Sequence, residues 1–175
     1  EYLTACHLTD QDDYPENVAE LARRDPNRWR EVVLLAGARV ARTSAGSIWN
    51  LAEALCYQNL EQKHSTPENA WGALLAGQAL AESANLQQIS PRNLTKRDRI
   101  RRWLMAILTE QAPFDSVQGD RVAPLPAVER ALAGNLLAQL GDLRPGVGLR
   151  EDGLPDIRWC DVPAGTFLMG STKKD

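Results

Sequence analysis

The chain has 175 residues, of which 43% are hydrophobic and 25% charged, and its formal net charge at pH 7 is -3. These values are close to those of ordinary globular domains and supply enough apolar residues for one packed core. The net negative charge argues against a protein that coats nucleic acid, so we expect no nucleic-acid partner. No apolar run of about 18 residues occurs and no signal-peptide core precedes the first charges, which predicts that nothing crosses a membrane.

The three cysteines, Cys6, Cys56 and Cys160, are odd in number and widely spaced. The disulfide frameworks of secreted domains usually contain an even number of cysteines at closer spacing. We therefore interpret the three side chains as reduced thiols and expect a cytoplasmic location.

Between residues 15 and 142 the apolar positions follow the helical period, which predicts a mainly α fold with five or six helices. The expected helix starts are Pro15, Asp25-Pro26-Asn27, Thr66-Pro67, Asn93 or Thr95, and Pro126. The positions expected to face the core are Val18, Leu21 and Ala22; Trp29, Val32, Val33, Ala36 and Val40; Ile48, Leu51, Ala52, Leu55 and Cys56; Trp71, Leu74, Leu75, Gln78 and Ala79; Ile100, Trp103, Leu104, Ile107 and Leu108; and Val128, Leu132, Leu136 and Leu140. A long loop is expected between Ala112 and Pro124.

Three tryptophans, Trp29, Trp71 and Trp103, recur near the starts of the expected helices. Burying one such side chain is worth roughly 3 kcal/mol, so we expect these three to anchor the core. Their spacing resembles that of stacked helix pairs of the HEAT or TPR kind, but the two intervals differ. The sequence therefore predicts a helical array without establishing a repeat.

The last part of the chain changes from a helical to an alternating pattern. Ile157 and Trp159 fall on one face of an extended segment, Pro163-Ala164-Gly165 supplies a turn, and Thr166–Met169 resumes an apolar run. This pattern predicts a short β-hairpin. Because an isolated hairpin is marginal in water, we expect it to open a larger β-containing domain.

The sequence pattern of this segment resembles the motif of a known family. The residues Trp159-x-x-Val162-Pro163-Ala164-Gly165-x-Phe167-x-Met169-Gly170-Ser171, followed by Asp175, are similar to the opening motif of formylglycine-generating-enzyme (sulfatase-modifying factor) domains. The resemblance implies a fold related to C-type lectins. The family includes enzymes that convert a sulfatase cysteine to formylglycine, iron enzymes and non-catalytic ligand-binding members. Its catalytic and metal-binding residues lie downstream of this motif, so the resemblance assigns no role to Cys160.

The beginning of the chain resembles a second family. Glu1-Tyr2-Leu3-Thr4-Ala5 is similar to the motif that closes the ATPase module of NACHT proteins, a branch of the STAND signalling NTPases. The run from Arg28 to Gly37 resembles the start of the helical region that follows in such proteins. Together the resemblances imply four parts: residues 1–14 as the tail of a NACHT-type module, 15–142 as a helical array, 143–154 as a linker, and 155–175 as the start of a formylglycine-generating-enzyme-like domain.

Few residues suggest chemistry. A phosphate-binding Gly-x-x-x-x-Gly-Lys-Ser/Thr loop is absent, and the glycine-rich run Arg144–Gly148 has neither the lysine nor a following apolar helix. His7 with Asp10, Asp12 and Asp13 is better explained as a solvated surface, because a metal site needs three or four converging ligands.

Other candidates lack partners at a useful spacing. His64 has no neighbouring ligand in the sequence, and Ser44, Ser47 and Ser171 have no His and Asp partners at the spacing of a known triad. We therefore expect no catalytic, cofactor-binding or metal-binding residue, and no enzymatic activity in this chain. ATP and Mg²⁺ are expected only for the ATPase module that the resemblance places upstream.

The run from Lys96 to Arg102, with Arg92 before it and Trp103 after it, is the main basic cluster. It could track a phosphate backbone, with Trp103 stacking on a base. The apolar stripe instead puts Trp103 on the buried side and the charges on an outer face, which favours a solvated face or a contact with an acidic neighbouring domain. Arg101→Ala is then expected to cost well under about 1 kcal/mol, and Trp29→Ala about 3 to 5 kcal/mol.

Two functions remain open at this point. In the first, the chain is a non-catalytic helical connector that senses the state of an ATPase and holds a recognition or effector domain. In the alternative, it is an N-terminal extension of a formylglycine-generating-enzyme-like oxidoreductase or ligand-binding domain. Either function implies neighbouring domains of the same protein as partners, and the first also allows other protein subunits.

Overall fold

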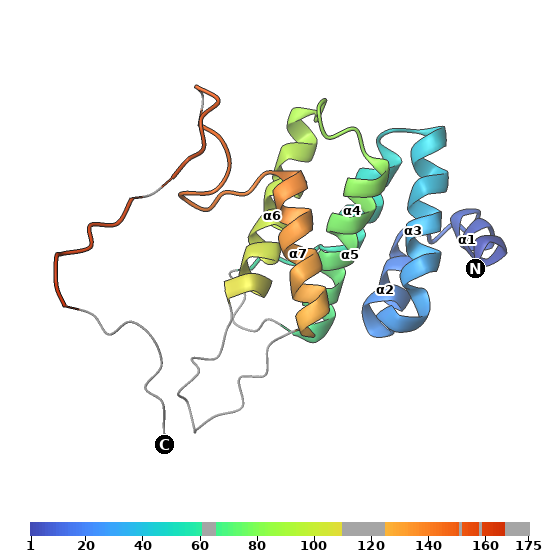
Figure 1. Ribbon diagram of the computed structural model, residues 1–175. Helices are drawn as coiled ribbons and strands as arrows, with labels where there is room; N and C mark the ends of the chain where they lie inside the picture. The colour runs from blue at the N-terminus through green and yellow to red at the C-terminus, as the bar shows by residue number, and fades with distance from the viewer. Residues whose placement is uncertain (61–65, 110–124, 151, 158, 167–175) are drawn as a thin grey trace, which may run out of the picture. The chain divides into compact units, whose positions relative to one another are not determined.

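The computed structural model describes residues 1–60, 66–109, 125–150, 152–157 and 159–166. The chain divides into two units, Glu1–Leu143 and Arg144–Asp175. Helices make up the described part of the first unit (Figure 1): α1 Tyr2–Thr9, α2 Glu16–Arg24, α3 Pro26–Thr43, α4 Ser47–Leu55, α5 Pro67–Ser83, α6 Pro91–Thr109 and α7 Ala127–Leu140. The prediction of a mainly α fold is therefore confirmed.

Among the described residues there are seven helices instead of the five or six expected. The additional one is α1, which buries only Ala5 and so has no apolar stripe that the sequence could reveal. The loop expected between residues 112 and 124 lies outside the described residues.

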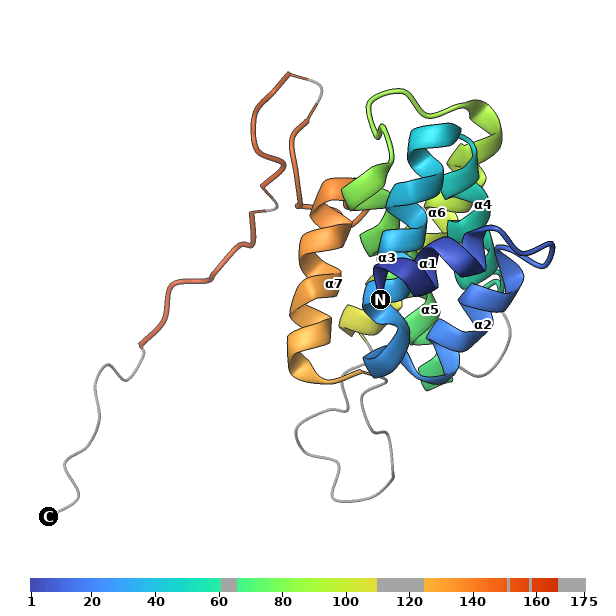
Figure 2. The same cartoon turned by 90° about the vertical axis from the view of Figure 1, so that its right-hand side faces the viewer.

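The helices alternate between two layers. Within one layer α1 contacts α3, α3 contacts α5, and α5 contacts α7; within the other, α2 contacts α4 and α4 contacts α6. Figure 2 shows α3 and α7 on the left of the unit and α2 and α4 on the right. Each helix also contacts the one that follows it from α2 to α7. Successive helices therefore pass from one layer to the other.

Helix starts follow local capping chemistry. The side chain of Asp25 accepts a hydrogen bond from the Arg28 backbone N–H at 3.2 Å, and the Thr66 hydroxyl accepts one from the Asn69 N–H at 3.3 Å. In both helices a proline occupies the next position, where its missing N–H costs nothing. These two predicted starts are confirmed, as is the start after Pro126.

The start of α6 differs from the prediction. The helix begins at Pro91, and the backbone N–H groups of Asn93 and Leu94 donate to the Ser90 carbonyl. Thr95 lies inside the helix, where its hydroxyl donates to the Arg92 carbonyl at 3.1 Å. The expectation that Asn93 or Thr95 caps α6 is wrong because the proline already begins the helix one turn earlier.

Helix α5 occupies the centre of the unit and contacts α2, α3, α4, α6 and α7. It is buried around nearly its whole circumference, and its small residues allow neighbouring helices to approach closely. The buried residues of α5 are Ala70, Gly72, Ala73, Leu74, Leu75, Ala76, Gly77, Ala79 and Leu80. At Gly72 the approach is closest, because a Cβ there would overlap the Leu55 carbonyl oxygen.

The tryptophan anchors differ from those expected. Trp49 and Trp103 are buried, with exposed fractions of 5% and 2%, whereas Trp29 and Trp71 are only partly buried. Trp29 and Trp71 lie near the starts of α3 and α5, which belong to one layer, whereas Trp103 lies in α6 of the other layer. The three tryptophans therefore do not mark equivalent positions of a repeat. Trp29→Ala is accordingly a weaker test of the core than we expected from the sequence.

The predicted buried faces are otherwise largely confirmed, with one clear exception. Val128 is 77% exposed, because α7 buries the stripe formed by Ala133, Leu136, Leu137 and Leu140 and Val128 lies off that stripe in the first turn. Ile48, Leu51, Ala52, Leu55 and Cys56 of α4 are all buried as expected.

A second, smaller apolar cluster joins α1 to α3. Its buried residues are Ala5, Val32 and Ala36, and the partly buried Leu8, Tyr14 and Trp29 pack against both this cluster and the main core. The Arg39 guanidinium reinforces the contact by donating to the Cys6 carbonyl at 2.7 Å and by pairing with Asp10 at 2.9 Å. Helix α1 is therefore fastened to α3 by both apolar and charged contacts.

The unit Arg144–Asp175 has no strand among its described residues. An isolated antiparallel bridge joins Leu149 to Pro155. The second half of the expected hairpin, from Phe167 onward, lies outside the described residues, so the hairpin and the lectin-related domain stay predictions. Trp159 and Val162 are 86% and 87% exposed.

No helix within the described ranges combines the length and the apolar character needed to span a bilayer.

The close contact at Gly72 predicts a large effect of adding one methyl group. Gly72→Ala should destabilise the protein by about 2 to 3 kcal/mol, because the new Cβ would force α5 away from the end of α4. Urea unfolding followed by circular dichroism measures this change.

Gly134→Ala in α7 is the matched control. Its Cβ would meet only Leu108 Cδ2, at 3.8 Å, so the substitution should be neutral or stabilise by up to about 1 kcal/mol. Similar free energies of unfolding for the two variants would show that the α4–α5 contact is looser than described.

Candidate functional site

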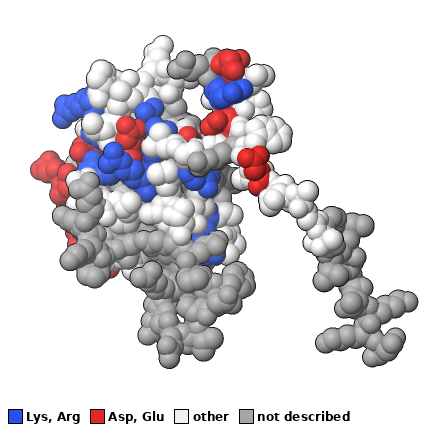
Figure 3. Space-filling view, turned by 90° about the vertical axis from the view of Figure 1, so that its left-hand side faces the viewer, with Lys and Arg blue, Asp and Glu red and all other residues white. Residues whose placement is uncertain are grey.

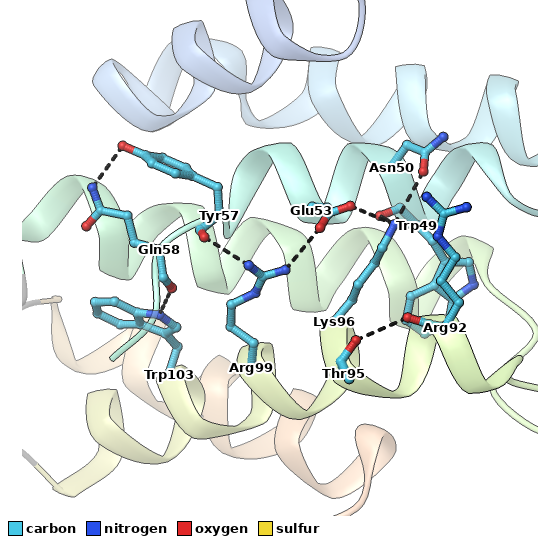
Figure 4. Close-up of polar contacts among 10 residues, drawn as sticks. All are labelled: Trp49, Asn50, Glu53, Tyr57, Gln58, Arg92, Thr95, Lys96, Arg99 and Trp103. Carbon is cyan, nitrogen blue, oxygen red and sulfur yellow. Dashed lines mark hydrogen bonds and ion pairs between the residues drawn. The ribbon is translucent and has the colours of Figure 1, made fainter. Parts of the chain in front are cut away.

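A row of polar contacts joins α6 to α4 and to the residues that follow α4. Lys96, Arg99 and Trp103 lie three and four residues apart, so they share one face of α6. Figure 4 shows these side chains reaching toward α4. We call the following set the α4–α6 seam: Trp49, Asn50, Glu53, Tyr57, Gln58, Lys96, Arg99 and Trp103.

Lys96 is a buried cation of the seam, with 5% of the residue exposed. Its Nζ lies 2.8 Å from Glu53 Oε2 and donates to Asn50 Oδ1 at 3.3 Å and to the Trp49 carbonyl at 3.5 Å. A buried ammonium group is stable only when it is paired and hydrogen-bonded. The three oxygens from α4 meet this requirement.

Arg99 holds the other end of Glu53. Its Nη2 donates to Glu53 Oε1 at 3.4 Å, and its Nη1 donates to the Tyr57 carbonyl at 2.9 Å. The hydrogen bond from Lys96 is the main reason that the pKa of Glu53 lies below its usual value, and Arg99 adds to the shift. The Nε of Arg99 is buried and has no hydrogen-bond partner.

Side chains of α2 and of the seam satisfy carbonyl groups in the last turn of α4 and just after it. The Ala54 carbonyl accepts a hydrogen bond from Arg23, the Tyr57 carbonyl from Arg99, and the Gln58 carbonyl from Trp103 Nε1 at 2.8 Å. Carbonyl groups in the last turn of a helix have no partner within the helix, and cations placed there also oppose the helix dipole. Arg23 of α2 therefore caps α4, and Arg99 and Trp103 of α6 bind the chain just beyond its end.

Arg101 points away from the seam and is also buried, with 7% of the residue exposed. Its Nε donates to the Gly141 carbonyl, at the end of α7, and its Nη1 lies 3.1 Å from Asp98 Oδ1. Gly141 has a φ of +92°, which only glycine adopts without strain. Arg101 thus joins α6 to the end of α7.

The expectation that the basic cluster lies on an outer face is therefore only partly right. Trp103 is buried as predicted, and Arg92 and Arg102 are exposed. Lys96 and Arg101, which we expected to face solvent, are buried instead. Lys96 pairs with the Glu53 carboxylate, and Arg101 donates to the Gly141 carbonyl. Both acceptors are 40 or more residues away in the sequence, so the helical period of α6 gave no sign of them.

Three cavities flank the seam. On the α2 side, a cavity of about 560 Å³ is lined by Tyr14, Pro15, Glu16, Glu20, Arg23, Asn50, Glu53, Ala54 and Tyr57. The Tyr14 hydroxyl is buried without a partner, and burial raises the pKa of Tyr14. On the other side, two cavities of about 260 and 340 Å³ share Asn59, Arg99 and Arg102.

The histidine and acidic residues near the start do not converge. His7 Nε2 interacts with Gln11 at 3.2 Å, whereas Asp10 pairs with Arg39. Within the ranges that the structure describes, no group of three or more His, Cys, Asp or Glu side chains is arranged to hold a metal ion. His64 and Ser171 lie outside those ranges.

In the glycine-rich run, the Gly146 N–H donates to Asp156 Oδ2 at 2.9 Å. This N–H group is therefore engaged by a carboxylate of the chain itself.

The three cysteines are free, but their surroundings differ. Cys56 is buried beneath the seam, and burial raises its pKa to about 12. Cys160 is exposed. At neutral pH Cys56 is therefore a neutral thiol that packs as an apolar group.

The burial of Arg101 changes the stability expected for its truncation. Arg101→Ala should destabilise the protein by about 2 to 3 kcal/mol, because it leaves the Gly141 carbonyl without its donor and removes one of the two cations paired with Asp98. Arg102→Ala, the exposed neighbour with no ion pair among the described residues, should cost less than about 0.5 kcal/mol. Equal free energies of unfolding in urea would contradict the burial of Arg101.

The seam also predicts a pH dependence. The folded-state pKa of Glu53 lies below its unfolded value of about 4.3. The ionised carboxylate therefore stabilises the folded protein above that unfolded value, and this stabilisation is lost as the pH falls through the folded-state pKa. Glu53→Gln should therefore cost about 1 kcal/mol at pH 7, with the difference from wild type shrinking below about pH 4.

Glu20→Gln is the control for this titration. Glu20 pairs with Arg24 on the surface, where both side chains are more than half exposed, so its loss should change stability by less than about 0.5 kcal/mol. Urea unfolding between pH 3 and pH 7 measures both variants. A Glu53→Gln difference that does not depend on pH would exclude the ion pair as its cause.

Comparison of the chain with protein-family models, with curated proteins and with solved structures found no match. The resemblances to NACHT proteins and to formylglycine-generating enzymes therefore stay predictions. The function proposed below is inferred from the contacts and exposed surfaces of the chain itself together with those resemblances.

Proposed function

We propose that this chain is a non-catalytic helical connector of a STAND-type signalling NTPase. In this proposal it lies between a NACHT-type ATPase module and a formylglycine-generating-enzyme-like domain, and it transmits the state of the first to the second. ATP and Mg²⁺ belong to the ATPase module, and this chain neither binds nor hydrolyses the nucleotide. The partners are the neighbouring domains and other protein subunits, in the cytoplasm.

The observation that carries the proposal is where the chain exposes large apolar side chains. Near the start, Tyr2 and Leu3 are 64% and 81% exposed. Near the end of the described residues, the exposed ones are Leu143, Val147, Leu149, Leu154, Ile157, Trp159 and Val162. Between these two regions, only Tyr57, Leu60 and Val128 are exposed among the described large apolar residues. Apolar side chains left exposed in groups commonly mark contacts with other domains.

The alternation of the helices between two layers also supports a connector. Stacked helix pairs of the HEAT and TPR kind pass from layer to layer in this way, and each unit contacts mainly its neighbours. The contacts of α1 with α3, of α3 with α5 and of α5 with α7 follow that order. This order supports a helical array, within which α5 also contacts α2.

A connector must transmit displacement, and polar contacts across the odd-numbered helices can do so. Arg30 of α3 donates to Gln78 of α5 at 2.9 Å and pairs with Glu129 of α7 at 3.1 Å. Arg39 ties α1 to the same helix α3. A movement of α1 would therefore act on α5 and α7 through α3.

The alternative, an N-terminal extension of a formylglycine-generating-enzyme-like domain, explains only one of the two apolar regions. It provides a partner for Trp159 and Val162, but it leaves Tyr2 and Leu3 without one. The connector provides a partner for both regions, so we favour it.

Hydrogen exchange tests the proposal by comparing this chain with the protein extended on both sides. In the extended protein, the amides of Trp159–Val162 and of the first turn of α1 should become protected by at least tenfold, because neighbouring domains cover them. The amides of Leu74–Leu80 in α5 are the control, since they are buried already and should exchange equally slowly in both. Unchanged exchange at both apolar regions would contradict the connector.

A further inference from the structure

The groove beside the seam, on the side away from α2, carries an excess of positive charge. From Arg92 to Arg102, α6 has six basic residues and one acidic residue, Asp98. Two carboxylates take part in the ion pairs: Glu53 with Lys96 and Arg99, and Asp98 with Arg97 and Arg101. Each carboxylate is shared by two cations, so the positive charge is only partly neutralised. Figure 3, viewed from the side where α6 and α7 lie in Figure 1, shows several Lys and Arg side chains close together.

The groove has a defined lining. The two adjoining cavities, of about 260 and 340 Å³, are lined together by Asn59, Leu60, Thr95, Asp98, Arg99 and Arg102. Their size is larger than a single phosphate ion requires and approaches that of small-molecule sites. Leu60 adds an apolar surface to an otherwise polar wall.

Within this lining, some donors are engaged and others are free. Arg99 is fixed at both terminal nitrogens by Glu53 and the Tyr57 carbonyl and its Nε is buried, so it supplies positive charge to the groove but no free donor. Arg102 is exposed and makes no ion pair among the described residues, and the Asn59 amide makes no hydrogen bond there. The Thr95 hydroxyl donates to the Arg92 carbonyl, and the Asp98 carboxylate forms ion pairs with Arg97 and Arg101.

These donors fit one kind of ligand. The guanidinium of Arg102 and the amide of Asn59 are two free donors on the groove, and Arg99 adds a fixed positive charge, which suits a doubly charged phosphate better than a singly charged carboxylate. We propose that the groove binds a small phosphate monoester, with the phosphate at Arg102 and Asn59, next to Arg99, and the organic part against Leu60. This site does not depend on the connector role, because it uses none of the exposed apolar residues near the two ends of the chain that carry that proposal.

Isothermal calorimetry on the full 175-residue chain tests the site at constant ionic strength. The probes are inorganic phosphate, glucose 6-phosphate, acetate and a single-stranded oligonucleotide. We expect saturable binding of glucose 6-phosphate at one site, tighter than that of inorganic phosphate, and no comparable binding of acetate.

Two variants that each remove one positive charge distinguish a specific binding site from general attraction to the positive charge of α6. Arg102→Gln removes the free guanidinium of the groove and should weaken binding of glucose 6-phosphate about tenfold or more. Arg92→Gln removes an exposed charge from the same helix outside the groove and should change binding by no more than about twofold. Unfolding in urea should show that both variants are as stable as the wild type.

Several results would overturn the site. One is the absence of saturable phosphate-ester binding. Another is an equal loss of affinity for glucose 6-phosphate in the two variants, which would indicate only general attraction to the positive charge of α6. Acetate binding as tight as that of glucose 6-phosphate would exclude a preference for phosphate. Much tighter binding of the oligonucleotide, equally sensitive to Arg92 and Arg102, would make the surface a nucleic-acid track instead. None of these results bears on the hydrogen-exchange test of the connector.

Discussion

The close approach of α4 and α5 at Gly72 is the constraint on which the rest of the helical unit depends. Because Gly72 has no side chain, the backbone of α5 can lie against the Leu55 carbonyl, at the end of α4. At Gly77, further along α5, a Cβ would meet Leu104 and Leu136 side chains at 3.3 and 3.5 Å, so α6 and α7 also pack tightly there. A central helix of alanine, glycine and leucine can therefore contact five others at once.

The same contact determines where the polar seam can form. With α4 held against α5 at its last residue, Leu55, the carbonyl groups that follow it lie within reach of α6. Arg99 and Trp103 then bind the carbonyls of Tyr57 and Gln58. Glu53, two residues before the end of α4, supplies the counter-charge for the cations of α6. A packing constraint in the apolar core thus places the charges around it.

The basic residues of α6 are divided between structure and surface by this arrangement. Lys96 and Arg101 point inward and hold α6 to α4 and to the end of α7, respectively. Arg92 and Arg102 stay exposed, and Arg102 lines the groove. The exposed apolar residues that we assign to domain contacts lie near the two ends of the chain, so the proposed domain contacts and the proposed phosphate-ester site can operate independently.

By itself, the sequence determined the mainly α fold and several helix starts, because helical periodicity and capping are local properties. Asp25 and Thr66 cap helices as their neighbours predict. What the sequence could not determine is which long polar side chains are buried: Lys96 and Arg101 belong to a run of charges that periodicity places on the surface. Their burial depends on acceptors that other helices bring to them, and only the tertiary structure decides where those acceptors lie.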